Sequence, residues 1–383
     1  MTTTTTSTNT MFDLPEELVE EILSRVPMTS LRSVRLSCKK WNALSKNRIV
    51  GKAATSQFIG FIMRDFRVCA LRLDLQGIRN DDGGDLGYPS IKQVSVLNHI
   101  EVFQTFHCDG LLLCVLKDYS RLLVWNPYLG QSSWIQPRND VDQFDHWFAL
   151  GYDKSRNHKI LRMFHYYRCN ELFSGSEIYE FSSKSWRVLV FTPHEEIRSL
   201  SNRHGQSLNG NAYFCAEEKI IMQEGVAEAG AFLLCFDFTS ERFGPRLSLP
   251  FHASDEDALN IYCVRDEQLA VLHEPWDIME IWVTNKTDHG QVSWSKFLEV
   301  DKTDLFTGHS LYPCFRSFFI DEEERVAVFF HVVGDVSTGN FWYQTAHIIG
   351  QDGYFKPVKI EQVKRYALPL VCSSYVPSLV KID

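Results

Sequence analysis

Two β-prone runs joined by a polar turn recur along most of this chain, and an aromatic residue leads the second run of each copy. The clear copies span residues 123–134, 178–186, 234–243 and 280–294, with fainter ones at residues 73–74 and 347–355. Their spacing is roughly 50–60 residues, close to the period of propeller blades. About six such units would close a ring that protects every strand edge. The repeat favours a propeller over a two-sheet β-sandwich in which the aromatics recur by chance.

Other short β-prone runs also lie between polar turns and continue this pattern. They lie at residues 58–63, 70–75, 111–116, 122–125, 160–164, 233–238 and 326–333. Aromatic residues make up 13% of the chain, and flat rings pack well on pleated surfaces. Asn126, Pro127 and Gly130 are expected to build one hairpin turn. Trp125 and Trp134, which flank this turn, are expected to fill the layer between blades.

The first fifty residues have a helical pattern instead. Asp13 is a good N-cap, Leu18, Ile22 and Val26 recur four apart on one face, and Pro27 ends the helix. Two shorter helices are expected before residue 56. Three helices in so short a segment make a poor core. The module either caps the β domain or completes its core on a partner.

This N-terminal pattern resembles an F-box motif, from Leu14 to Pro27 and on to Trp41. Thr29 stands where a basic residue is common, and residues 46–50 lack the usual ending of the motif. The resemblance implies a contact with the Skp-type adaptor of an SCF (Skp–cullin–F-box) ubiquitin ligase and, through it, with cullin and a RING protein. The implied adaptor-binding residues are Leu14, Pro15, Leu18, Ile22, Leu23, Val26, Pro27, Leu31, Val34 and Trp41.

Most of the remaining chain resembles the plant F-box-associated domain. The motifs that carry the resemblance lie at residues 108–114, 124–135, 150–162, 177–186, 208–213, 234–243 and 374–380. The fold class is therefore expected to be α+β multidomain, with a three-helix F-box before a six-bladed kelch-like β-propeller. The expected divisions are a disordered Thr/Ser-rich tail at residues 1–10, the F-box at 11–56 and the β domain at 57–383.

Charge and cysteine usage restrict the partners. The formal net charge is −9, which disfavours binding to a phosphate backbone. No apolar run reaches the roughly 18–20 residues that span a bilayer. The ten cysteines are scattered singly and are expected to be buried reduced thiols of a nuclear or cytoplasmic protein. Neither nucleic acid nor membrane is expected as a partner.

Catalytic motifs are incomplete. His273 and Glu274 begin like a zinc-protease helix, but Asp277 replaces the second histidine and Pro275 would break the helix. Ser207 lies in an imperfect nucleophile elbow, where Asn209 replaces the closing glycine. We therefore expect a non-catalytic protein with no metal and no cofactor.

These observations favour a substrate-recognition subunit whose β domain captures a target protein for ubiquitination. The alternative is a propeller that binds a ligand or glycan outside ubiquitination. Target contacts are expected in loops that carry aromatic and charged side chains. The candidates are Phe144, Trp147, His165, Tyr167, Arg168, His273, Trp276, Phe341 and Trp342.

Overall fold

A computed structural model of the 383-residue chain describes most residues from Phe58 to Ile382. The longest gaps in that description are residues 76–89, 219–229 and 306–316. Before residue 58 it describes Pro15, Leu18, Val19, Lys39, Trp41 and Leu44. In the part of the chain that the structure describes, no helix has the length and apolar character needed to cross a membrane.

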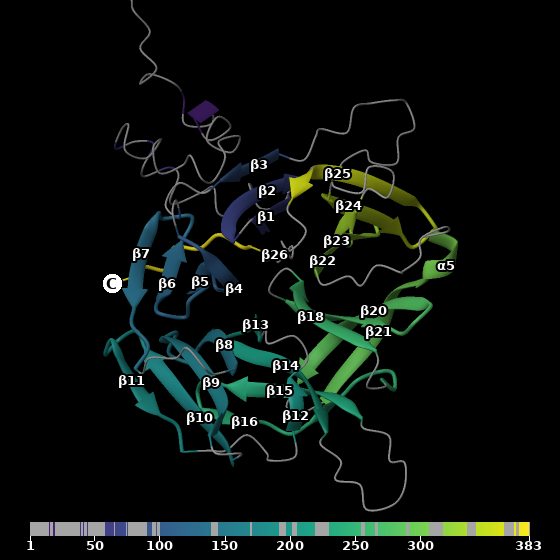
Figure 1. Ribbon diagram of the computed structural model, residues 1–383. Helices are drawn as coiled ribbons and strands as arrows, with labels where there is room; N and C mark the ends of the chain where they lie inside the picture. Colours follow the sequence, from purple (N-terminus) through teal and green to yellow (C-terminus); the bar gives the residue numbers. More distant parts are fainter. Residues whose placement is uncertain are drawn as a thin grey trace, which may run out of the picture.

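The described strands form antiparallel sheets arranged as a ring around a common centre (Figure 1). One blade contains β4 (Val102–Cys108), β5 (Leu111–Leu116), β6 (Leu122–Asn126) and β7 (Gln131–Ile135). The next contains β8 (Asp145–Tyr152), β9 (His158–Arg168), β10 (Glu171–Glu180) and β11 (Ser185–Val188). In both, strands adjacent in sequence are adjacent in the sheet.

Three further blades also have four strands. One contains β18 (Ala258–Val264), β19 (Gln268–Glu274), β20 (Ile278–Asp288) and β21 (Gln291–Asp301). Another contains β22 (Ser317–Asp321), β23 (Val326–Gly334), β24 (Trp342–Gly350) and β25 (Phe355–Val363). The third joins the two ends of the propeller, because β26 (Val371–Cys372) pairs with β1 (Phe58–Arg64), followed by β2 (Arg67–Leu73) and β3 (Ser90–Gln93).

The remaining sheet departs from this repeat. β12 (Ile197–Leu200) and β13 (Gln206–Leu208) both pair with β14 (Asn211–Glu218). β16 (Arg242–Phe243) and β17 (Leu247–Ser248) both pair with β15 (Ala231–Asp237). Pro245 lies between these two short strands, and a proline has no N–H to continue the ladder. The result is a six-stranded sheet with interrupted edges.

The predicted fold class is therefore wrong for the described residues. They are nearly all β, and their longest helical segment is the four-residue α5 (Lys302–Leu305). The three helices expected before residue 56 lie largely outside the description, although Leu18, Val19, Lys39, Trp41 and Leu44 are helical there. The six-bladed kelch-like repeat is corrected too. Five sheets are regular four-stranded blades, and the stretch from β12 to β17 does not form another.

The predicted hairpin repeat matches the third and fourth strand positions of successive sheets. The aromatic residue on the second strand of each hairpin pairs in register with a residue on the first strand. The pairs are Leu123 with Trp134, Tyr179 with Trp186, Phe236 with Phe243, and Thr284 with Trp294. Trp125 is buried as predicted, but Trp134 is 44% exposed and is covered on one face by the Arg121 guanidinium. Trp134 lies on the outermost strand, so the prediction that it fills the layer between blades is wrong.

Apolar residues between neighbouring sheets form the core. Every residue of β5 is buried, because a strand in the middle of a blade is covered on both faces by the adjacent sheets. The outer strand β11 is largely exposed. One cluster joins the β8–β11 blade to the β12–β17 sheet through Leu161, Ile178, Phe214 and Phe236.

After β26, residues 375–382 cross the β4–β7 blade as a C-terminal strap. The buried Asn126 side chain donates from Nδ2 to the carbonyl oxygens of Ser378 and Val380, at 3.2 and 2.7 Å. Its Oδ1 accepts from Leu129 N, and Gly130 has φ +68°, so the predicted turn is confirmed. The same asparagine thus shapes a local turn and anchors the end of the propeller.

Candidate protein-binding face

The topology gathers distant segments on one side of the ring. The inner strands β26, β4, β8, β13, β18 and β22 surround the centre (Figure 1). Radial repetition makes these inner strands run the same way along the axis. The ends of β9, β19 and β23 and the starts of β8, β18 and β22 therefore lie on one side, here named the loop face. The opposite side is named the turn face.

All the described residues predicted to contact a target lie at the loop face. Trp147 is near the start of β8, and Trp342 is the first residue of β24. His165, Tyr167 and Arg168 lie near the end of β9, where β9 pairs with the start of β10. The loop expected there is therefore a β-hairpin. Phe144 and Phe341 lie outside the described residues. Target contact by these residues stays a prediction.

Trp147 is half-buried and packs against the core cluster between its blade and the β12–β17 sheet. Part of its ring is therefore packed in the core. The side chains of His165, Tyr167, Arg168 and Trp342 are not described, although their backbone positions are.

His273 is buried near the end of β19, with 5% of its surface exposed. Its Nδ1 lies 3.2 Å from Glu280 Oε2 and its Nε2 lies 3.0 Å from Asp257 Oδ2. The ring stacks on Phe251, with 4.0 Å between the ring centroids. These contacts make His273 a packed link between β19, β20 and the segment before β18, and not an exposed target contact.

Glu280 connects this link to Lys296 on β21. Lys296 Nζ donates to Glu280 Oε1 at 2.6 Å and also pairs with Glu299. Burial alone would raise the pKa of Glu280, but hydrogen bonds from Lys296, His273 and Trp282 outweigh burial and hold that pKa below its usual value. Glu280 therefore stays ionised at neutral pH and accepts hydrogen bonds from Lys296 and Trp282.

Trp276 is the most exposed tryptophan among the described residues, at 78%. It occupies the short turn between β19 and β20, and this turn is held from the α5 side. Lys302 Nζ donates to Pro275 O, and Lys302 N donates to Asp277 O, each at 2.7 Å. The Lys302 side chain is itself buried. A large apolar ring is thus presented to solvent on a rigid support, which is typical of a protein-binding contact.

The sequence alone did not identify the residues that support this turn. Asp257, Glu280 and Lys302 are separated from His273 and Trp276 by several to many residues, and no local spacing connects them. Their roles depend on the register between strands and on the link from β21 into α5.

The predicted adaptor-binding residues are mostly outside the description. Leu18 is helical and 52% exposed, whereas the adjacent Val19 is buried at 1%. Trp41 is helical and half-buried. Pro15 is exposed, and its carbonyl oxygen accepts from Val19 N at 3.1 Å. Leu14, Ile22, Leu23, Val26, Pro27, Leu31 and Val34 are not described.

The incomplete catalytic motifs have no helical or elbow geometry. His273 and Glu274 lie in strand β19, and Ser207 lies in strand β13. Within the described segments, no group of three or more His, Cys, Asp or Glu side chains has the arrangement of a metal site.

Comparison with known families covers nearly the whole chain. The F-box domain family matches residues 11–52, and the F-box associated beta propeller domain family matches residues 59–382. These matches agree with the resemblance inferred from the motifs.

Curated relatives from Arabidopsis thaliana match over nearly their full lengths. The chain is 52% identical to the F-box/kelch-repeat protein At3g13680, with 98% of this chain and 97% of that protein covered. It is 53% identical to the putative F-box protein At4g17200, with 97% and 100% covered. It is 48% identical to the F-box protein At3g49510, with 98% and 99% covered.

Proposed function

Because the chain belongs to the family of F-box proteins with an F-box associated β-propeller domain, we propose that it is the substrate-recognition subunit of an SCF ubiquitin ligase. In this proposal the F-box docks the Skp-type adaptor, which connects it to cullin and a RING protein. The propeller captures a target protein in the nucleus or cytoplasm.

The observation that carries this proposal is the combination of an F-box with a propeller that has its own closed core. β26 pairs with β1, and the strap then fixes the chain end to the β4–β7 blade. The propeller can therefore fold as a unit of its own and hold a target while the F-box is bound to the adaptor. Exposed Leu18 beside buried Val19 supports a helix with one face toward its own module and another toward a partner.

Trp276 on the loop face supports a role in capture. Its backbone is held by Lys302, so binding a target would cost little ordering entropy in this turn. The receptor needs no transfer chemistry of its own in this mechanism. It holds a target lysine near a charged ubiquitin conjugate, which makes a bimolecular encounter effectively intramolecular.

Co-expression with a plant Skp-type adaptor tests the adaptor half of the proposal. We expect a one-to-one complex on size exclusion, and poor solubility of the chain alone because the F-box lacks its partner. A chain that is monodisperse alone and forms no complex with the adaptor would contradict the proposal.

Ubiquitin transfer tests the receptor half. The purified chain with ubiquitin-activating and ubiquitin-conjugating enzymes should transfer nothing until the adaptor, cullin and RING protein are added. A ubiquitin thioester on any cysteine of this chain would overturn the role of a receptor without catalysis.

A further inference from the structure

The turn face, opposite the face proposed for target capture, contains a cavity of about 190 Å³. It is named the turn cavity here. Its lining residues come from the ends of three strands near the centre of the ring and from the turns that follow them. They are Cys108, Asp109, Tyr152, Arg156, Ser207, Asn209 and Gly210.

Two tight hairpins contribute to the wall. Asp109 and Gly110 join β4 to β5 with φ +50° and +73°, and Asn209 and Gly210 join β13 to β14 with φ +51° and +84°. Two consecutive residues with positive φ are the signature of a type I′ turn, which favours Asp-Gly and Asn-Gly. The sequence therefore places a short polar side chain at the same point of each hairpin.

These turns are held firmly from behind. Tyr375 of the C-terminal strap donates its hydroxyl to Gly110 O, and Ser378 Oγ donates to Asp109 O. On the other hairpin, Tyr152 N donates to Gly210 O at 3.0 Å. A Cβ on Gly210 would lie 2.5 Å from the Tyr152 ring, so this wall is closely packed. The cavity is thus a preformed feature of three converging turns.

The lining carries both signs of charge. Asp109 Oδ2 lies 3.3 Å from Arg156 Nη1 and 3.3 Å from His158 Nε2. The Arg156 guanidinium also covers the Tyr152 ring. An anion would meet the Asp109 carboxylate, and a cation would meet the Arg156 guanidinium. The balanced pair therefore suits a neutral molecule that both accepts and donates hydrogen bonds.

Ser207 lines the cavity without offering its hydroxyl to a ligand. It is 7% exposed, and its Oγ is closed to solvent and has no hydrogen-bond partner among the residues that the structure describes. A ligand hydroxyl is about as large as a water molecule, so it cannot reach this oxygen. The polar contacts of a ligand would therefore come from Asp109 and Arg156.

We propose that the turn cavity binds a small neutral polyol of about monosaccharide size. Vicinal hydroxyls would donate to Asp109 and accept from Arg156. The cavity is smaller than the roughly 300–1,000 Å³ of sites for drug-sized ligands, which restricts the ligand to a single small ring. The site is separate from the loop face, so it adds a ligand to the protein without competing with the target.

Calorimetric titration of the chain in complex with its adaptor tests this proposal, with myo-inositol and D-glucose as probes. We expect at least one probe to bind with a dissociation constant in the millimolar range. Asp109→Asn should weaken that binding about tenfold. The asparagine suits the positive φ at position 109, so the turn is retained. Ser132→Ala, on the exposed face of β7, is the matched control and should leave binding unchanged.

Several results would overturn the proposal. One is no heat of binding from either probe at concentrations up to about 50 mM, which leaves the cavity to ordered water. Another is equal binding by the native chain and Asp109→Asn. Tighter binding of inorganic phosphate or glycine than of either polyol would show a charged ligand class instead. Adaptor binding in the same samples reports separately on the proposed ligase role.

Discussion

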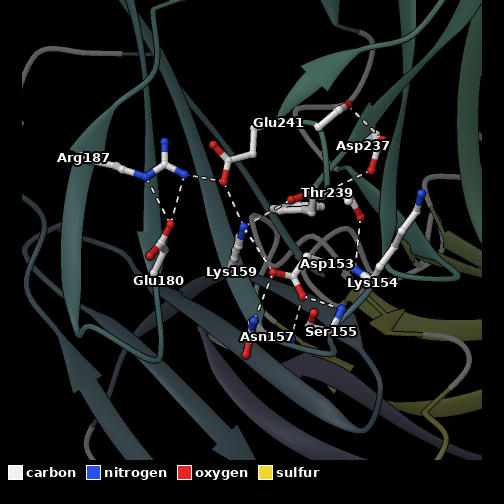
Figure 2. Close-up of polar contacts among 12 residues, drawn as sticks. Asp153, Lys154, Ser155, Asn157, Lys159, Glu180, Arg187, Asp237, Thr239 and Glu241 are labelled. Carbon is white, nitrogen blue, oxygen red and sulfur yellow. Dashed lines mark hydrogen bonds and ion pairs between the residues drawn. The ribbon is translucent and has the colours of Figure 1, made fainter.

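The Lys159 ammonium lies 2.9 Å from Glu241 Oε1 and joins two neighbouring sheets of the ring (Figure 2). Lys159 belongs to β9, whereas Glu241 precedes β16. Arg187 pairs with the same Glu241 carboxylate and with Glu180, and Lys159 also reaches Asp153 Oδ2 at 3.4 Å. This set of charges is mostly buried and connects the outer parts of both sheets.

Replacing Lys159 by methionine should destabilise the propeller, because Glu241 and Asp153 would lose a buried cation. The side chains of Lys159 and Glu241 are only 10% and 17% exposed. We expect a loss of about 3 kcal/mol in the free energy of unfolding, measured by urea denaturation. The neighbouring Lys154 has an exposed side chain, and Lys154→Met is the matched control. Equal stability of both variants would show that the network contributes little.

Stability should fall in acid through the same network. Burial alone would raise the pKa of Glu241, but hydrogen bonds from Arg187 and Lys159 outweigh burial and hold that pKa below the usual value for a glutamate. A depressed carboxyl pKa contributes stability above the unfolded-state value, and that stability is lost as the pH falls through the folded-state value. Urea midpoints between pH 7 and 3 should therefore drop below about pH 4.5, less steeply for Glu241→Gln. Parallel curves for the two proteins would contradict this assignment.

Trp276→Ala should weaken target capture without unfolding the propeller. The ring is 78% exposed, so its removal leaves no cavity in the core. Exposed tryptophans at interface centres commonly contribute about 2 kcal/mol or more, which corresponds to at least a tenfold loss of affinity. Pull-down of targets from plant lysate followed by mass spectrometry measures the effect. Trp134→Ala on the outer strand β7 is the control, and an equal loss in both variants would point to a non-specific effect.

Leu18→Ala should weaken adaptor binding while target capture is retained. Burial of a leucine side chain at an interface contributes roughly 1.5–3 kcal/mol, so affinity should fall about 10- to 100-fold. Surface plasmon resonance on the immobilised adaptor measures this change. Leu379 on the C-terminal strap is 47% exposed, and Leu379→Ala is the matched control. Simultaneous loss of adaptor and target would mean that the F-box and the propeller do not act as separate modules.

Local features of the fold were predictable from sequence because short-range chemistry determines them. The repeated hairpins were found from their β-prone runs and aromatic positions, and they match consecutive strands such as β6–β7 and β10–β11. The acidic turn at Asp321 is determined by local chemistry in the same way. Its Oδ1 accepts from the backbone N–H groups of Glu323 and Glu324 between β22 and β23. In these cases the donor, the acceptor and the turn residue lie within a few positions of one another.

The arrangement of the candidate sites depended on tertiary structure. Sequence drew attention to His273 and Trp276 together, yet the fold buries the histidine between Asp257 and Glu280 and exposes the tryptophan. It likewise brings Asp109 and Ser207 from different sheets to one cavity. Sequence by itself determined the β-rich repeat, the F-box motif and the turn chemistry. Only the tertiary structure decided exposure, the irregular β12–β17 sheet and the convergence of distant turns, because these depend on strand register and on the packing of whole blades around a common axis.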